Sequence, residues 1–122
     1  MKLVDTDVLI DHLRGRSDAV ELLRSIAANS CISVLSRFEI LAGMRSGERH
    51  VTRALLDAWP NVAVTQEAAS RAGEMARIYR ASHQAISPVD YLLAATVEVH
   101  GHELITLNTR HYPMFPDLEA PY

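Results

Sequence analysis

The sequence predicts an α/β fold in which helices cover both faces of a mainly parallel sheet. Short apolar runs alternate along the 122 residues with longer segments of helical periodicity, and strands that alternate with helices form parallel sheets. The chain shows no internal repeat and no low-complexity linker. Because this length suits one core, residues 1–122 are expected to form a single domain with three layers, α/β/α.

The first half of the chain is expected to contain two strands and four helices. In order, these are a strand at 2–4, a helix over 8–15, a helix over 17–28, a strand at 31–35, a helix over 36–46 and a helix over 48–59. The segment Ser36-Arg37-Phe38-Glu39 has the spacing of a capping box, in which a serine and a glutamate three residues later each bond to the other's backbone. This spacing predicts that Ser36 begins its helix.

The second half begins with a strand at 62–64 and a long helix over 66–83. Ser87-Pro88-Val89-Asp90 repeats the capping-box spacing, with proline at the first helical position, and Gly101 is a typical stop. A helix is therefore expected between them. A strand at 104–107 follows, and the proline-rich tail is expected to be loop, with a short edge strand near Leu118.

Composition and charge exclude several classes of protein. The net charge of −3 argues against the broad basic face of many sequence-independent nucleic-acid binders. The apolar opening is interrupted by Asp5, Thr6 and Asp7, which excludes a signal peptide or membrane span there and predicts a cytoplasmic location without a membrane partner. Cys31 has no partner for an internal disulfide and is expected to be a buried apolar residue.

Four oxygen-bearing side chains are expected at one edge of the sheet. Asp5 ends the first strand, Glu39 and Asp90 begin helices, and Asn108 follows the last strand; parallel strands deliver their carboxyl ends to the same edge. Each residue also has a structural explanation, since Asp5 or Asp7 could cap a helix, Glu39 and Asp90 could complete capping boxes, and Asn108 is an ordinary turn residue. Carboxylates gathered together repel each other unless a cation neutralises them, so we expect a divalent metal.

An oxygen-only site suits Mg²⁺, with Mn²⁺ as a possible substitute, rather than zinc. The six histidines form no zinc pattern. A metal held by carboxylates can align a water for attack on a phosphate, which makes phosphodiester cleavage the expected reaction. Arg14 and Arg110 are the candidates for binding a nucleic-acid substrate near the acidic edge, although either could be a solvated surface charge.

Four segments of the sequence carry the motifs of a known family. They are Val4-Asp5-Thr6-Asp7-Val8-Leu9-Ile10-Asp11, the stretch from Ser33 to Gly43, Val89-Asp90-Tyr91-Leu92-Leu93-Ala94-Ala95-Thr96, and the ending from His100 to Tyr112 with Pro121-Tyr122. Together they resemble the PIN-domain nucleases, and specifically the VapC toxins of type II toxin-antitoxin systems. The segments occur in the family's order, and the resemblance spans essentially the whole chain. It implies a PIN-like three-layer fold.

The resemblance also implies an activity, partners and ligands. The chain would be a toxin that cleaves RNA and is silenced by a cognate VapB-type antitoxin, usually as a homodimer that reaches operator DNA only through the antitoxin. Asp5 and Asp90 would be the principal metal ligands and Glu39 the third acid. Asn108 stands where the family often has aspartate, which puts a second metal in doubt and suggests that Asn108 orients water or substrate. Asp7 stands where asparagine is common, and its contact with the metal is left open.

The antitoxin is expected to fold an apolar segment onto the helices at 7–14 and 36–46. A basic side chain from this partner could then occupy the place of the metal and pair with Asp5 and Asp90. The apolar residues of these two helices could also simply belong to the core.

Three functions other than a nuclease are compatible with parts of the sequence. The loop Asp5-Thr6-Asp7 also resembles the nucleophile loop of haloacid-dehalogenase-like phosphatases, and a response-regulator receiver has similar length and topology. Both families place a lysine beside the phosphate at a later strand end, whereas Lys2 is the only lysine here. A catalytically inert antitoxin-binding module is the non-enzymatic alternative, and the presence of Asp5, Glu39 and Asp90 argues against it.

Overall fold

The computed structural model describes the whole chain, from Met1 to Tyr122, and its centre is a sheet of four parallel strands. The strands are β1 (Lys2–Val4), β2 (Ser30–Ser33), β3 (Asn61–Val62) and β4 (Glu103–Ile105), and their order across the sheet is β3-β2-β1-β4. The first strand therefore lies inside the sheet, between a strand near it in sequence and one from the far end of the chain. This confirms the predicted mainly parallel sheet.

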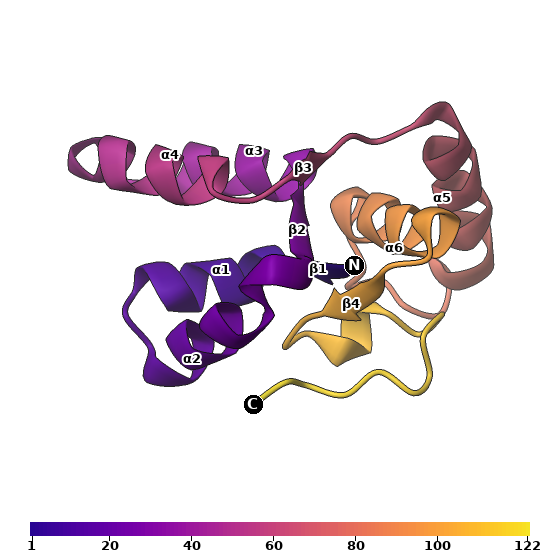
Figure 1. Cartoon of the computed structure of the whole chain (residues 1–122). Helices are drawn as coiled ribbons and strands as arrows, with labels where there is room; N and C mark the ends of the chain where they lie inside the picture. The colour runs from indigo at the N-terminus through magenta and orange to yellow at the C-terminus, as the bar shows by residue number, and fades with distance from the viewer.

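Six α-helices cover the sheet in two layers (Figure 1). They are α1 (Thr6–Leu13), α2 (Ser17–Ile26), α3 (Val34–Gly43), α4 (Arg49–Asp57), α5 (Gln66–Tyr79) and α6 (Pro88–His100), with short 3₁₀ helices at Ala27–Asn29, Ser46–Glu48 and Thr109–His111. The helices α1 to α4 lie on one side of the strands and α5 with α6 on the other. The fold has the three expected layers, and none of its helices is both long and apolar enough to cross a membrane.

Alternation along the strands divides the core between these two layers. Leu3 is paired in register with Cys31 and Leu104, and all three belong to the cluster under α5 and α6. Val4, one residue later, turns to the cluster formed with α1 to α4. Strands buried on both faces are typical of parallel sheets covered by helices. Cys31 is fully buried, as predicted.

The start of α3 differs from the prediction. Ser33, and not Ser36, is the N-cap, and its hydroxyl accepts the backbone N–H of Leu35 at 3.0 Å. Ser36 lies inside the first turn, where its buried side chain meets Thr6. The prediction of a strand through residue 35 and of a capping box between Ser36 and Glu39 is therefore wrong. A serine was available at both positions, and the contact with α1 placed the second one in the interior.

Other boundaries are confirmed or shortened. The capping box between Ser87 and Asp90 is present, and Gly101 ends α6 with a left-handed φ of 68°. The helix α5 ends at Tyr79, four residues before the predicted end at His83. The Ser82 hydroxyl and the backbone N–H groups of Ser82 and His83 all donate to the Tyr79 carbonyl and form turns there. The segment near Leu118 forms a turn rather than the expected edge strand.

Candidate functional site

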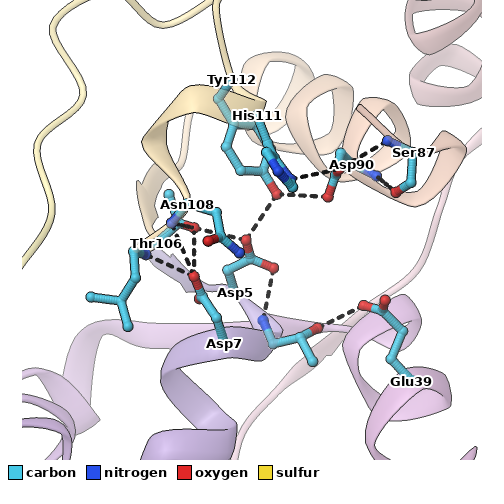
Figure 2. A network of polar contacts seen from close by, with 11 residues as sticks. Asp5, Asp7, Glu39, Ser87, Asp90, Thr106, Asn108, His111 and Tyr112 are labelled. Carbon is cyan, nitrogen blue, oxygen red and sulfur yellow. Dashed lines mark hydrogen bonds and ion pairs between the residues drawn. The ribbon is translucent and has the colours of Figure 1, made fainter. Parts of the chain in front are cut away.

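The predicted acidic residues meet at the carboxyl ends of β1, β2 and β4 (Figure 2). Asp5 follows β1, Glu39 lies in α3 after β2, and Asp90 lies in the first turn of α6. Asn108 follows β4, as predicted. The sheet therefore brings together residues that are more than a hundred positions apart in the sequence.

Asp5 is the buried centre of this edge. It is the N-cap of α1, where Oδ1 accepts the N–H of Thr6 at 2.7 Å, and Oδ2 accepts the hydroxyls of Thr106 at 2.9 Å and Tyr112 at 2.8 Å. Only 8% of the residue is exposed. Burial, and then the nearby charge of Asp7, raise the pKa of Asp5 from 3.8 to about 6 although the hydrogen bonds oppose this rise. The ionised carboxylate is thus incompletely compensated and would be stabilised by a cation.

Asp90 completes the capping box of α6 and also faces the acidic edge. Its Oδ2 accepts the Ser87 N–H at 3.0 Å and contacts His111 Nδ1 at 3.2 Å, while the hydroxyl of Tyr112 lies 3.5 Å from Oδ1. The capping role and the site role are therefore compatible in one side chain. The hydroxyl of Tyr112 links Asp90 to Asp5, since it touches both carboxylates.

Glu39 is not a capping residue but contacts the start of α1. Its Oε1 accepts the hydroxyl of Thr6 at 2.7 Å, and the same hydroxyl lies 3.0 Å from Ser36 Oγ. Thr6 follows Asp5 directly, so Glu39 is connected to the buried carboxylate through one residue. The sequence offered a capping box with Ser36 as the structural explanation of Glu39, and this explanation is excluded because Ser33 is the N-cap.

Asp7 ties α1 to the end of β4. Its Oδ2 accepts the backbone N–H groups of Leu107 at 2.9 Å and Asn108 at 3.1 Å, while Oδ1 accepts the N–H of Val8 at 2.8 Å. The Thr106 hydroxyl, which donates to Asp5, also lies 3.2 Å from Asp7 Oδ2. Both oxygens therefore have protein donors. The sequence did not determine whether Asp7 contacts the metal. In the structure its carboxylate holds the loop after β4.

The remaining predicted residues are exposed around this centre. Asn108 is bonded through its backbone, and its exposed side-chain amide forms no hydrogen bond within the chain. Arg14 and Arg110 are exposed, and neither forms a salt bridge. Arg14 lines a cavity of about 410 Å³ that Glu39 also lines, so this arginine lies beside the acidic edge with its charge free.

The donor set fits a divalent metal in its chemistry. Asp5 and Asp90 offer carboxylate oxygens, and the only lysine, Lys2, is paired with Glu103 instead. Mg²⁺ typically uses one or two carboxylates and completes its shell with water and substrate phosphate. No three acidic, histidine or cysteine side chains are grouped closely enough to hold an ion by themselves. Glu39 Oε1 is already bonded to the Thr6 hydroxyl. The site therefore fits a cation held by two carboxylates, those of Asp5 and Asp90, with Glu39 nearby.

Tyr112 and His111 are the site residues that the sequence did not single out. His111 was one of six histidines without a zinc pattern, and Tyr112 occurred only within the segment that ends the family resemblance. Their proximity to Asn108 along the chain was the available signal, because a residue at the end of β4 brings its neighbours to the same edge. The partners that they contact are distant in sequence, and no local pattern shows them.

Comparison with known proteins gives one consistent result. Residues 2–114 match the family model of the PIN domain. Ribonuclease VapC19 of Mycobacterium tuberculosis is 46% identical over 125 residues, which cover all of both chains. A chain in a toxin-antitoxin complex from Klebsiella pneumoniae superimposes with a TM-score of 0.83 at 28% identity, over 100% of this chain and 98% of that one. A chain of DNA-bound VapBC from Salmonella typhimurium, at 18% identity, has the same fold with a TM-score of 0.81, over 98% and 95% of the two chains.

Proposed function

The chain belongs to the PIN-domain family and, within it, to the VapC toxins, and from this premise we propose that it is an endoribonuclease that depends on Mg²⁺ or Mn²⁺. Full-length identity of 46% to a protein named Ribonuclease VapC19 supports the ribonuclease activity. The observation that carries the metal dependence is the pair of carboxylates, Asp5 and Asp90, that approach a single Tyr112 hydroxyl. Two carboxylates in one partly buried place favour a divalent cation.

Asp5 and Asp90 would hold the ion, with Glu39 as the third acid. A cation bound there would lower the pKa of a bound water and neutralise charge that develops on a phosphate. Other groups of the chain orient these two carboxylates. The Thr6 N–H and the Thr106 hydroxyl bind the Asp5 carboxylate, and the capping box of α6 holds the Asp90 carboxylate. Positioned carboxylates need no rearrangement when substrate arrives.

The substrate is proposed to be RNA, bound by its phosphates beside the acidic edge. Arg14 and Arg110 are exposed and free of salt bridges within the chain, and arginine presents a planar fork that matches phosphate oxygens. The unbonded side-chain amide of Asn108 could orient a water or a substrate oxygen there. The acidic centre would repel phosphate by itself, so we expect these arginines and the cation to offset that repulsion.

A VapB-type antitoxin is the proposed partner. The comparison structures from Klebsiella pneumoniae and Salmonella typhimurium are toxin-antitoxin complexes, the second with DNA, and any contact with operator DNA would pass through the antitoxin. The cavity that Glu39 borders suits an apolar segment of that partner, because Ile10 and Leu13 from α1 and Ile40 and Met44 from the α3 side line it. These are the two helical regions expected from the sequence. A basic side chain of the antitoxin could pair with the acidic residues, and a second copy of the chain would complete the complex as a homodimer.

A cleavage assay tests the proposal. Purified chain is incubated with labelled RNA in Mg²⁺, in Mn²⁺ and in excess chelator, beside Asp90→Asn and the control Asp117→Asn, an exposed carboxylate in the tail. Cleavage should require the cation and should be lost in Asp90→Asn alone. Cleavage at full rate in chelator would exclude the metal, and no cleavage of any RNA by the wild-type chain would favour an inert antitoxin-binding module.

A further inference from the structure

Tyr112 is a core residue whose polar end reaches the acidic site. It is 1% exposed and belongs to the cluster under α5 and α6. Its ring stacks on Phe115, with centroids 6.5 Å apart and planes inclined by 21°. Packing of this kind allows the ring little freedom. The position of the hydroxyl is therefore set by the core and not by the carboxylates that it contacts.

The hydroxyl lies between the two proposed metal ligands (Figure 2). Its oxygen is 2.8 Å from Asp5 Oδ2 and 3.5 Å from Asp90 Oδ1. A phenol has one proton to donate, and the shorter contact identifies Asp5 as its acceptor.

The hydrogen bonds are distributed unevenly over the oxygens of both carboxylates. In Asp5, Oδ2 accepts the hydroxyls of Thr106 and Tyr112, whereas Oδ1 accepts only the N–H of Thr6. In Asp90, Oδ2 takes the Ser87 N–H and the His111 contact, whereas Oδ1 has only the 3.5 Å approach of the phenol. A carboxylate oxygen has two lone pairs. The Oδ1 atom of each carboxylate is thus the one with free capacity to bind a cation.

We propose that Tyr112 is a positioning residue for cation binding: by donating to Oδ2 of Asp5 it fixes the rotation of that carboxylate and leaves Oδ1 available to a divalent ion shared with Asp90. The inference rests on the proposed function, in which these two carboxylates hold the ion. Groups that orient metal ligands through hydrogen bonds are a general requirement of metal sites. If the hydroxyl served only to satisfy a buried carboxylate, its removal would lower stability and leave the cation affinity unchanged.

The test is Mn²⁺ binding by the purified chain without RNA, measured by calorimetry or by electron paramagnetic resonance. Tyr112→Phe keeps the ring and its packing and removes only the donor. We expect its Mn²⁺ affinity to fall by ~10-fold, in the range seen when hydrogen-bond partners of metal ligands are removed. The matched control is Tyr122→Phe, which removes a bond of the same 2.8 Å length from Asp11 Oδ2; its Mn²⁺ affinity should equal that of the wild type.

Two further measurements separate positioning from folding. Thermal unfolding checks that Tyr112→Phe is folded at the temperature of the titration, and cleavage is then measured over a range of Mn²⁺ concentrations. The rate of Tyr112→Phe should recover toward that of the wild type as Mn²⁺ saturates, with the KM for RNA unchanged. A merely structural role would not move the Mn²⁺ midpoint.

The outcomes distinguish the inference from the function on which it rests. Equal Mn²⁺ affinities of the wild type and folded Tyr112→Phe would overturn the positioning role and leave the two-carboxylate site intact. Absence of Mn²⁺ binding by the wild type would overturn the metal dependence, and the inference with it. An equal loss of affinity in Tyr122→Phe would also overturn the inference, because the effect would not then be specific to the acidic site.

Discussion

Asp90 accepts the backbone N–H of Ser87 at 3.0 Å, and Ser87 in return accepts the N–H of Asp90 at 3.2 Å. The side chain that completes this capping box also stands within reach of Tyr112 and His111 at the acidic edge. One carboxylate thus has a structural role and a proposed chemical role, and substitutions can separate them.

Asp90→Asn should abolish most RNA cleavage while the chain stays folded. The amide keeps the size of the side chain and can still accept the Ser87 N–H, but it removes the negative charge that would bind the cation. We expect a loss of about 1 kcal/mol in the free energy of unfolding. Ser87→Ala is the control, since it removes the cap hydroxyl at a similar cost but keeps the backbone N–H that orients Asp90, and should leave cleavage nearly unchanged. Equal loss of cleavage in both variants would assign the effect to the helix cap.

Glu39→Gln should reduce cleavage by ~10-fold or more, as for a residue that supports a metal site. Glutamine can still accept the Thr6 hydroxyl, so the fold should not change, and thermal unfolding checks this. Glu48 lines the same cavity from the 3₁₀ turn before α4, which makes Glu48→Gln the control. Wild-type turnover in Glu39→Gln would limit Glu39 to a contact between α1 and α3.

Asp5→Asn should stabilise the chain in the absence of divalent cations. Burial raises the pKa of Asp5 to about 6, so the folded state binds this proton more tightly than the unfolded state, and stability contributed by the neutral form is lost as pH rises through 6. The advantage of Asp5→Asn over the wild type in unfolding free energy should grow by about 2 kcal/mol between about pH 4 and about pH 7. Denaturant unfolding in chelator measures this difference. Added Mn²⁺ should narrow it at neutral pH by stabilising only the wild type.

Arg110→Ala should weaken RNA binding and flatten its dependence on salt. Loss of one phosphate contact on a single strand lowers the slope of log affinity against log salt by about 0.7. Binding is measured with Asp90→Asn as the background, so that the RNA is not cleaved. Arg77→Ala serves as the control, since this exposed arginine in the last turn of α5 forms no salt bridge. A slope equal in both would remove Arg110 from the proposed RNA surface.

Expression of the wild-type chain should arrest growth, and Asp5→Asn should not. Co-expression of a cognate VapB-type antitoxin should restore growth to cells that express the wild type. The comparison of growth requires equal levels of the wild-type and Asp5→Asn proteins, which immunoblotting checks. If both chains arrest growth equally, the toxicity does not come from the acidic site.

Local signals predicted those parts of the fold that depend on neighbours in the sequence. Ser87, Pro88 and Gly101 define α6 because a cap, a fixed φ and a left-handed stop act within a few residues. The same rule misplaced the start of α3, where Ser33 and Ser36 were both suitable caps. Contact between Ser36 and Thr6 is a tertiary interaction, and capping preferences contain no information about it.

The sequence predicted which edge of the sheet carries the candidate site, but it did not predict the contacts between the side chains there. The alternation of strands and helices was enough to bring Asp5, Glu39 and Asp90 together. It could not show that Asp7 would bind the loop after β4, or that a tyrosine would stand between two carboxylates. Both depend on side-chain directions that are fixed only after the core has packed.

The position of β1 inside the sheet has a consequence for the protein during its synthesis. Asp5 leaves the ribosome well before the residues whose hydroxyls bind it, since Thr106 and Tyr112 lie 101 and 107 positions later. The helices α1 to α4 and strands β1 to β3 can collapse earlier, since chains fold from the N-terminus as they emerge. The acidic centre cannot be assembled until β4 and the segment after it are translated. A nascent chain is therefore expected to be harmless to the RNA around it until synthesis has passed Tyr112.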